Sequence, residues 1–294
     1  MENYMKTFEK ANAKINLFLD VVGKMEDGFH EIRSIMHSVS LCDSISVERF
    51  PSSEGRISIF VRGKYFLPCN NKNLAYRAAE MFSEALQEKL SVRIGIQKRI
   101  PVAAGLAGGS SDAAAVLKAL NRINGYPFTR EKLCEIGEKL GSDVPYCILG
   151  KTQLCCGRGE KMQMLPFKKK LNFVVAIGDE HVSTALAYAR LDEMYGDFKE
   201  TGADSEQKYN ALMKAIAEQD ERGVAANMYN IFESAVLPMC PEAQAIKEKM
   251  LEQGALGAMM SGSGPSVFGI FESREKAEQV ASLIGENAFV ASSV

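Results

Sequence analysis

Apolar residues recur at every second position in the first stretch of the chain, residues 7–22. The alternating members are Ala11, Ala13, Ile15, Leu17, Leu19 and Val21. A period of two predicts a β-strand with one buried face. The same alternation predicts strands over residues 43–49, 56–62 and 91–100, and the first two of these are expected to pair antiparallel across the turn at 51–55.

Helical spacing of apolar residues appears between and after these strands. Asn73 is expected to cap one helix, residues 113–123 form a second, and Thr129 caps a third that runs to residue 140. The second half of the chain predicts strands near 151–156, 172–177, 255–260 and 266–271 and a short last strand. Helices are expected between 183 and 235, over 241–253 and over 274–285. The whole pattern is that of an α+β protein with helices on one face of a mostly antiparallel sheet.

A length of 294 residues is enough for two domains. The charged, glycine-containing run 157–170 is the best place for a boundary. We therefore predict an N-terminal domain over 1–165 and a C-terminal domain over 166–294.

Charge and cysteine content narrow the functional classes. The 35 basic and 37 acidic residues leave no basic footprint for nucleic acid and no attraction to an anionic membrane. Seven cysteines without a C-x-x-C pair suit neither a disulfide framework nor a zinc site, and they are interpreted as reduced core residues. An apolar leader and a bilayer-length apolar run are both missing, which predicts a cytoplasmic protein.

A small-residue loop runs from the strand at 91–100 into the helix at 113–123. Its members are Pro101, Val102, Ala103, Ala104, Gly105, Leu106, Ala107, Gly108, Gly109, Ser110 and Ser111. Residues without bulk let backbone amides approach a ligand, and Ser110 or Ser111 is expected at the N-cap, where the helix dipole favours a polyanion. The loop fits neither the Walker A nor the dinucleotide-binding pattern. It predicts a di- or triphosphate site, with an ordinary glycine-rich turn as the alternative.

Two details of the small-residue segments bear on that prediction. Alanine at 103, 104 and 107 is harmless if φ is negative there and costly if it is not. A second tight turn, containing Gly262, Ser263 and Gly264, joins two short apolar strands and could supply further amides to a phosphate, or be a plain hairpin turn.

Three stretches, residues 13–17, 101–111 and 260–265, resemble in that order the three motifs of the GHMP small-molecule kinases. The resemblance implies a two-domain GHMP kinase fold: an N-terminal ribosomal-protein-S5-like domain, a ferredoxin-like C-terminal domain, and an active site in the cleft between them. It also implies ATP as the phosphate donor, with Mg²⁺ carried on ATP and helped by Ser110 or Ser111, because no Walker B carboxylate is evident. The other protein ligands of the metal stay open.

One branch of this superfamily fits most closely, through residues 13–19, 27–30, 43–47 and 140–145. Its members phosphorylate the 2-hydroxyl of a cytidine-diphospho-methylerythritol in the non-mevalonate isoprenoid route. The resemblance implies that Asn16 bonds the substrate near that hydroxyl, that Phe29 stacks on cytosine and that His30 reads its edge. Tyr188 is proposed as the second stacking aromatic. Phe29 replaces the usual tyrosine, which keeps the stacking plane and loses a phenolic hydrogen bond.

Lys14 and Asp143 are, by motif, the catalytic pair of such an enzyme. A tertiary alcohol is a poor nucleophile, so a carboxylate is wanted to take its proton, and an ammonium beside it can orient that carboxylate and neutralise phosphoryl charge. Residues 141–145 are expected to form a compact turn. Taken singly, Asp143 could be a turn residue before Pro145 and Lys14 a solvated lysine.

The expected partner is therefore a small molecule with a cytidine diphosphate group, bound by a monomer or homodimer. The alternatives are a homoserine or mevalonate type of GHMP kinase, or a ligand-sensing relative without turnover. An RNA-binding module is disfavoured by the acidic balance.

Overall fold

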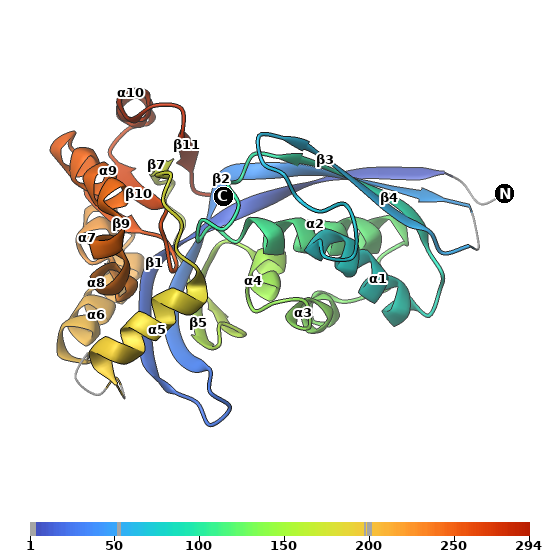
Figure 1. Cartoon of the computed structure of the whole chain (residues 1–294), viewed down its shortest axis with the longest axis horizontal. Coiled ribbons are helices and arrows are strands. Elements are labelled where there is room, and N and C mark those ends of the chain that lie inside the picture. Colours follow the sequence, from blue (N-terminus) through green and yellow to red (C-terminus); the bar gives the residue numbers. More distant parts are fainter. Residues whose placement is uncertain (1–3, 52–53, 197, 199–201) are drawn as a thin grey trace. The chain divides into compact units, whose positions relative to one another are not determined.

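The computed structural model describes residues 4–51, 54–196, 198 and 202–294 (Figure 1). The chain forms two compact units that are interleaved in sequence. Unit 1 consists of residues 1–13, 42–102 and 107–150, and unit 2 of residues 14–41, 103–106 and 151–294.

The strands and helices have the following bounds. The strands are β1 (Met5–Lys24), β2 (His30–Phe50), β3 (Ile57–Gly63), β4 (Ser91–Lys98), β5 (Thr152–Gly157), β6 (Lys161–Met164), β7 (Asn172–Ala176), β8 (Tyr229–Asn230), β9 (Gly257–Met260), β10 (Val267–Phe271) and β11 (Ala288–Ser292). The helices are α1 (Leu74–Leu86), α2 (Gly108–Ile123), α3 (Arg130–Glu138), α4 (Asp143–Leu149), α5 (Thr184–Tyr195), α6 (Gly202–Glu218), α7 (Glu221–Ala226), α8 (Phe232–Val236), the 3₁₀ turn η1 (Leu237–Met239), α9 (Pro241–Glu252) and α10 (Arg274–Ile284).

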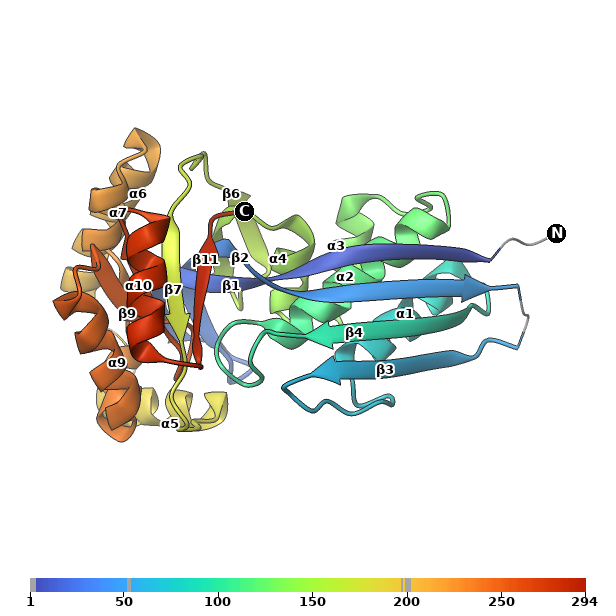
Figure 2. The ribbon, with the colours of Figure 1, turned by 90° about the horizontal axis from the view of Figure 1, so that it is seen from above.

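Unit 1 is a sheet covered on one face by α1 to α4 (Figure 2). Its strand order is β3-β4-β2-β1, with β3 parallel and β2 antiparallel to β4. Alternate residues of β2 and β4, such as Ile45 and Ile94, pack against small residues of α2 and against Phe82 of α1. The caps expected at Asn73 and Thr129 are confirmed, because each side chain accepts a backbone N–H of the first helical turn.

Unit 2 contains the other ends of β1 and β2. There β1 pairs parallel with β8, and β2 pairs antiparallel with β5, which pairs with β6. A separate four-stranded sheet has the order β11-β7-β10-β9. Its core joins residues of β7, β10, α9 and α10 to Phe232 of α8.

The predicted α+β class with mostly antiparallel pairing is confirmed, and three local predictions are wrong. Residues 43–49 and 56–62 do not pair, because β4 lies between them. Strand β2 begins at His30 instead of 43, since residues 32–39 are buried except for a half-buried Arg33 and the apolar alternation disappears. The turn expected at 141–145 opens the helix α4, whose first turn tolerates Pro145.

The predicted division at residue 165 has no single counterpart among the two units. The chain passes between them within β1, within β2, at both ends of the segment 103–106 and once more after residue 150, and the run 157–170 contains strand β6. The boundary at 165 stays a prediction.

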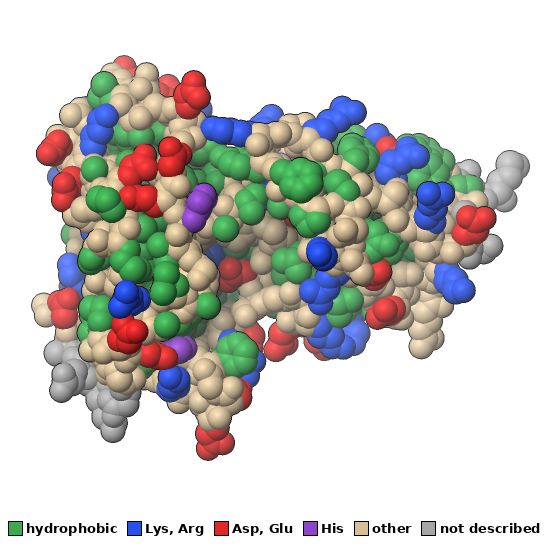
Figure 3. Space-filling view, in the orientation of Figure 1, with side chains coloured by type: hydrophobic (Ala, Val, Ile, Leu, Met, Phe, Trp, Pro, Cys, Tyr) green, Lys and Arg blue, Asp and Glu red, His purple; other side chains and the backbone are tan. Residues whose placement is uncertain are grey.

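The surface carries both signs of charge, interspersed on the face shown in Figure 3. Among the described helices, none is long and apolar enough to cross a bilayer. The cysteines are free thiols as predicted, although only Cys155 and Cys240 are buried and Cys69 is exposed.

Candidate active site

The loop predicted to bind phosphate leads into α2, which begins at Gly108. The N-cap is Ala107, with a left-handed φ of 55°, so the expectation that Ser110 or Ser111 occupies the N-cap is wrong. Both serines lie in the first helical turn. The amides of Gly108, Gly109 and Ser110 have no acceptor within the helix, which leaves them available to an anion.

Ser110 and Ser111 differ in what their hydroxyls can reach. Ser111 is buried, donates to the backbone carbonyl of Asn12 and contacts Cys147 Sγ at 3.3 Å. Ser110 is partly exposed. Of the two, Ser110 is therefore the one whose hydroxyl can serve a ligand.

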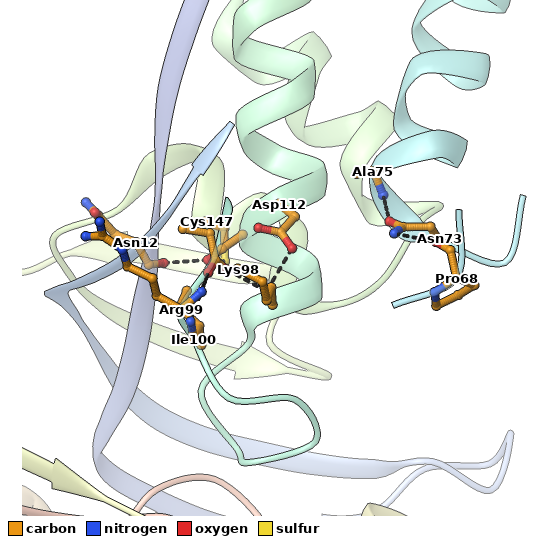
Figure 4. Close-up of polar contacts among 11 residues, drawn as sticks. Asn12, Pro68, Asn73, Ala75, Lys98, Arg99, Ile100, Asp112 and Cys147 are labelled. Atoms are coloured by element: carbon orange, nitrogen blue, oxygen red, sulfur yellow. Dashed lines mark hydrogen bonds and ion pairs between the residues drawn. The ribbon is translucent and has the colours of Figure 1, made fainter. Parts of the chain in front are cut away.

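Sequence reasoning missed a buried ionic cluster of Asp43, Lys98 and Asp112. Figure 4 shows Lys98 and Asp112 of this cluster at the first turns of α2. Lys98 Nζ donates to Asp43 and, at 2.8 Å, to Asp112 Oδ2. Asp43 also accepts the backbone N–H groups of Arg99 and Ile100, which is the pattern of an ionised carboxylate. The cluster therefore ties β2 and the end of β4 to the first turns of α2.

Burial raises the pKa of Asp112 to about 8, against the opposing pull of Lys98 and with the help of the neighbouring Asp43 charge. Asp112 Oδ1 has no hydrogen-bond partner within the described part of the chain. One ammonium thus faces two carboxyl groups, of which Asp112 is the neutral one at pH 7. The sequence held a signal for this cluster: Lys98 continues the buried period of Val92, Ile94 and Ile96.

The central residues of the loop, 103–106, belong to unit 2 and pack against the turn between β9 and β10. Gly105, with φ +71°, would drive a Cβ to 2.2 Å from the carbonyl oxygen of Ser261. Ser261 Oγ donates to Gly105 O at 3.2 Å, and Ser266 Oγ donates to Ala104 O. The absence of a side chain at 105 is what allows these two backbones to meet.

Lys14 lies at the same place within unit 2. Its backbone amide donates to Leu106 O at 3.1 Å, and a Cβ on Gly262 would lie 3.4 Å from its Nζ. The structure therefore gathers Lys14, loop residues 103–106 and the third motif in one unit. The antiparallel pairing of β9 and β10 confirms that this turn joins two strands.

The amides of that turn are partly committed. Ser261 N donates to Ser266 O and Gly264 N donates to Ser261 O, whereas Gly262 N and Ser263 N have no hydrogen-bond acceptor among the described residues. Ser263 Oγ lies 3.0 Å from Thr184 Oγ1. The turn can thus offer two amides to an anion.

A chain of hydrogen bonds orients Lys14. Nζ donates to Asn16 Oδ1 at 2.8 Å, Asn16 Nδ2 donates to Ser34 Oγ at 2.8 Å, and Ser34 Oγ donates to the carbonyl of Phe18. Lys14 and Asn16 are buried, which fixes both side chains. Two further protons of the Lys14 ammonium remain for a ligand or a carboxylate.

Asp143 is the first residue of α4 in unit 1 and is half-buried. Because Lys14 belongs to unit 2, their pairing stays a prediction.

The residues predicted to bind a nucleobase surround the β1–β2 hairpin of unit 2. Phe29 is 55% exposed, and the guanidinium of Arg158 lies 3.9 Å from the centre of its ring and pairs with Asp27. His30 stacks on Tyr188 with ring centroids 4.5 Å apart. Tyr188, the proposed second stacking aromatic, thus lies against His30. The stacking of Tyr188 on cytosine stays a prediction.

Two protein-family models match this chain and define the class of protein to which its fold belongs. The model of the GHMP kinases N terminal domain matches residues 73–151, and that of the GHMP kinases C terminal domain matches residues 212–288. The fold is therefore the two-domain fold of the GHMP kinases, as the resemblance implied.

Relatives by sequence narrow that class. A protein of Caldicellulosiruptor saccharolyticus, 4-diphosphocytidyl-2-C-methyl-D-erythritol kinase, is 41% identical over 92% of this chain and 90% of its own length. The same kinase of Alkaliphilus metalliredigens is 44% identical over 92% of this chain and 89% of its own length. A crystal structure of 4-(cytidine 5'-diphospho)-2C-methyl-D-erythritol kinase superposes with a TM-score of 0.78 at 31% identity, covering 97% of this chain and 98% of that one. The chain belongs to the family of 4-diphosphocytidyl-2-C-methyl-D-erythritol kinases.

Proposed function

We propose that this chain transfers the terminal phosphoryl group of ATP to the 2-hydroxyl of 4-(cytidine 5'-diphospho)-2-C-methyl-D-erythritol, a step of the non-mevalonate route to isoprenoids. The observation that carries the proposal is identity above 40% to kinases of that name over about nine-tenths of both chains. A stacked His30 at the tip of a hairpin supports it, because a small alcohol without a base needs no aromatic platform.

The donor phosphates are assigned to the start of α2 and the turn at 261–265. Within the described part of the chain, the amides of Gly108, Gly109 and Ser110 have no acceptor and suit a polyanion, and those of Gly262 and Ser263 suit another part of it. Mg²⁺ would be carried on ATP, with Ser110 the residue that fits it. Among the described residues, no cluster of three His, Cys, Asp or Glu could hold a metal by itself. Bound Mg²⁺ would neutralise phosphate charge.

Asp143 is assigned as the base that takes the proton of the tertiary alcohol late in the transfer. Lys14, oriented by Asn16, is assigned to neutralise charge on the passing phosphoryl group and to hold Asp143 ionised. Asn16 is assigned to the substrate near the reacting hydroxyl. The roles of Lys14 and Asp143 act on charge that develops mainly in the transition state.

A coupled assay tests the substrate. Purified protein receives ATP with the cytidine-diphospho sugar alcohol, homoserine or mevalonate in parallel. We expect ADP formation with the first alcohol only. Turnover of homoserine or mevalonate would replace this proposal by another GHMP activity, and no turnover of any would favour a ligand-sensing relative.

Lys14→Ala and Asp143→Asn test the catalytic pair. Each is expected to lower kcat by about 10²–10⁴-fold while the variant protein stays folded. Lys10→Ala, an exposed lysine on the same strand, is the matched control for Lys14 and should keep wild-type turnover. A near-normal kcat in either catalytic variant would refute that residue's role.

A further inference from the structure

The imidazole of His30 is held by a carboxylate on α5. His30 Nε2 lies 2.6 Å from Asp192 Oδ1, and Lys24 Nζ donates to Asp192 Oδ2 at 2.7 Å. Lys24 ends β1 and His30 begins β2, so one carboxylate joins both sides of the hairpin to α5, which lies beside it in Figure 1. The side chain of Asp192 is 30% exposed and that of His30 is 10% exposed.

The protonation of the Asp192 carboxyl and of the His30 ring is set by the hydrogen bonds between these groups and Lys24. Partial burial raises the pKa of Asp192, but the hydrogen bonds from Lys24 and His30 outweigh that effect and lower the pKa below its ordinary value. An ionised carboxylate only accepts hydrogen bonds, so His30 Nε2 must carry a proton. In the neutral ring, the proton on Nε2 leaves Nδ1 with a lone pair.

His30 Nδ1 has no hydrogen-bond partner within the described part of the chain, and the plane of the ring is fixed. Tyr188 stacks on one face of the ring at 4.5 Å and 27°, and Phe198 meets it edge-on at 5.6 Å and 88°. Tyr188 is itself held by Phe232 at 4.9 Å. The lone pair therefore has a defined direction, which a reader of a base edge requires.

We propose that Asp192 is a positioning residue for base selection: it fixes the His30 tautomer so that Nδ1 accepts a hydrogen bond from the 4-amino group of cytosine. This inference rests on the proposed function and names the atom pair that discriminates the base. In a cytidine the 4-amino group is the sole N–H donor of the base's pairing edge. Uracil presents a carbonyl oxygen at that position, and two lone pairs would face each other.

Asp192→Asn is the decisive variant, because the amide keeps the size of the side chain and can donate to Nε2 through its NH₂ group. The proton of the imidazole can then move to Nδ1. We expect KM for the cytidine-diphospho sugar alcohol to rise about tenfold with kcat within about twofold, since one neutral hydrogen bond contributes about that factor. The preference for this substrate over its uridine counterpart, measured as a ratio of kcat/KM, should fall about tenfold.

Glu193→Gln is the matched control. It is the same change at the next position of α5, where the carboxylate is 64% exposed and pairs only with Arg190 among the described residues. We expect its KM, kcat and base preference to equal those of the wild type. A double variant with His30→Ala separates positioning from fold support: once His30 is absent, Asp192→Asn should change neither KM nor base preference further.

A readout independent of turnover is the tautomer of His30 in the free protein, from long-range ¹H–¹⁵N spectra assigned with His30→Ala. The wild type should show the Nε2-protonated form and Asp192→Asn an increased share of the Nδ1-protonated form. An Nδ1-protonated wild type, or an unchanged base preference in Asp192→Asn, would overturn the role of Asp192 alone. A wild type that turns over neither nucleotide would overturn the proposed function and the selectivity with it.

Discussion

Replacing Asp112 by asparagine should make the protein more stable at neutral and alkaline pH, with a difference that grows with pH. The folded pKa of about 8 lies above the ordinary value of 3.8, so between these values the folded chain holds a proton that the unfolded chain has lost. The stability contributed by this group is complete below about pH 4, falls as pH rises, and levels off above about pH 8. The slope approaches about 1.4 kcal/mol per pH unit.

Asparagine at 112 keeps an oxygen for Lys98 and removes the titration. Relative to the wild type, the free energy of unfolding of Asp112→Asn should therefore rise by about 2–3 kcal/mol between pH 6 and pH 8 and change little above pH 8.5.

Urea unfolding followed by circular dichroism at half-unit steps from pH 5.5 to 9 measures this difference. Glu138→Gln, an exposed carboxylate at the end of α3, is the control and should show a flat difference from the wild type. A flat difference for Asp112→Asn between pH 6 and 8 would mean that Asp112 is already ionised at neutral pH, and the account of the cluster would be wrong.

Two further changes test the backbone of the loop and a buried histidine. Ala103 and Ala107 both have a φ of 55°, so Ala103→Gly and Ala107→Gly should each raise the free energy of unfolding by about 0.5–1 kcal/mol. Ala104→Gly should lower it, because φ is not positive at residue 104. Thermal unfolding of the three variants checks the sign of each change. Burial lowers the pKa of His37 to about 4, below its usual 6.5, so stability is complete above pH 6.5 and falls by up to about 1.4 kcal/mol per unit as pH drops toward 4. In urea titrations at pH 7, 6 and 5, His37→Gln should lose this dependence and the exposed His181→Gln should keep it.

Sequence periodicity predicted the elements of this fold wherever one face is buried and the other is not. It failed on the first part of β2, where Ser34, His37 and Ser38 are buried among apolar neighbours and the pattern carries no period. The predicted start of α2 was too late, because nothing in the sequence pattern indicates that Ala107 adopts a left-handed conformation and caps the helix.

The motifs pointed to residues of unit 2 that lie together, but not to the residues that hold the candidate site residues in place. Lys14, Asn16 and the turn at 261–265 do lie together within unit 2, although their roles remain proposals. The partners Asp192 and Arg158 lie far along the chain from the residues that they hold, and only folding brings them there. Lys98, a lysine at a buried position of β4, is a supporting residue that the sequence pattern did indicate.

Because both units contain part of β1 and β2, the order in which the chain is synthesised affects its folding. Both long strands have been synthesised once the first 50 residues have left the ribosome. Their partners β8 and β5 are encoded after residue 150. A nascent chain or a fragment ending there can close the Lys98 cluster, but it keeps two unpaired strand edges in water, which are templates for association with other chains. Expression of separate halves should therefore yield aggregates, and a split version of this protein would have to be assembled by co-expression.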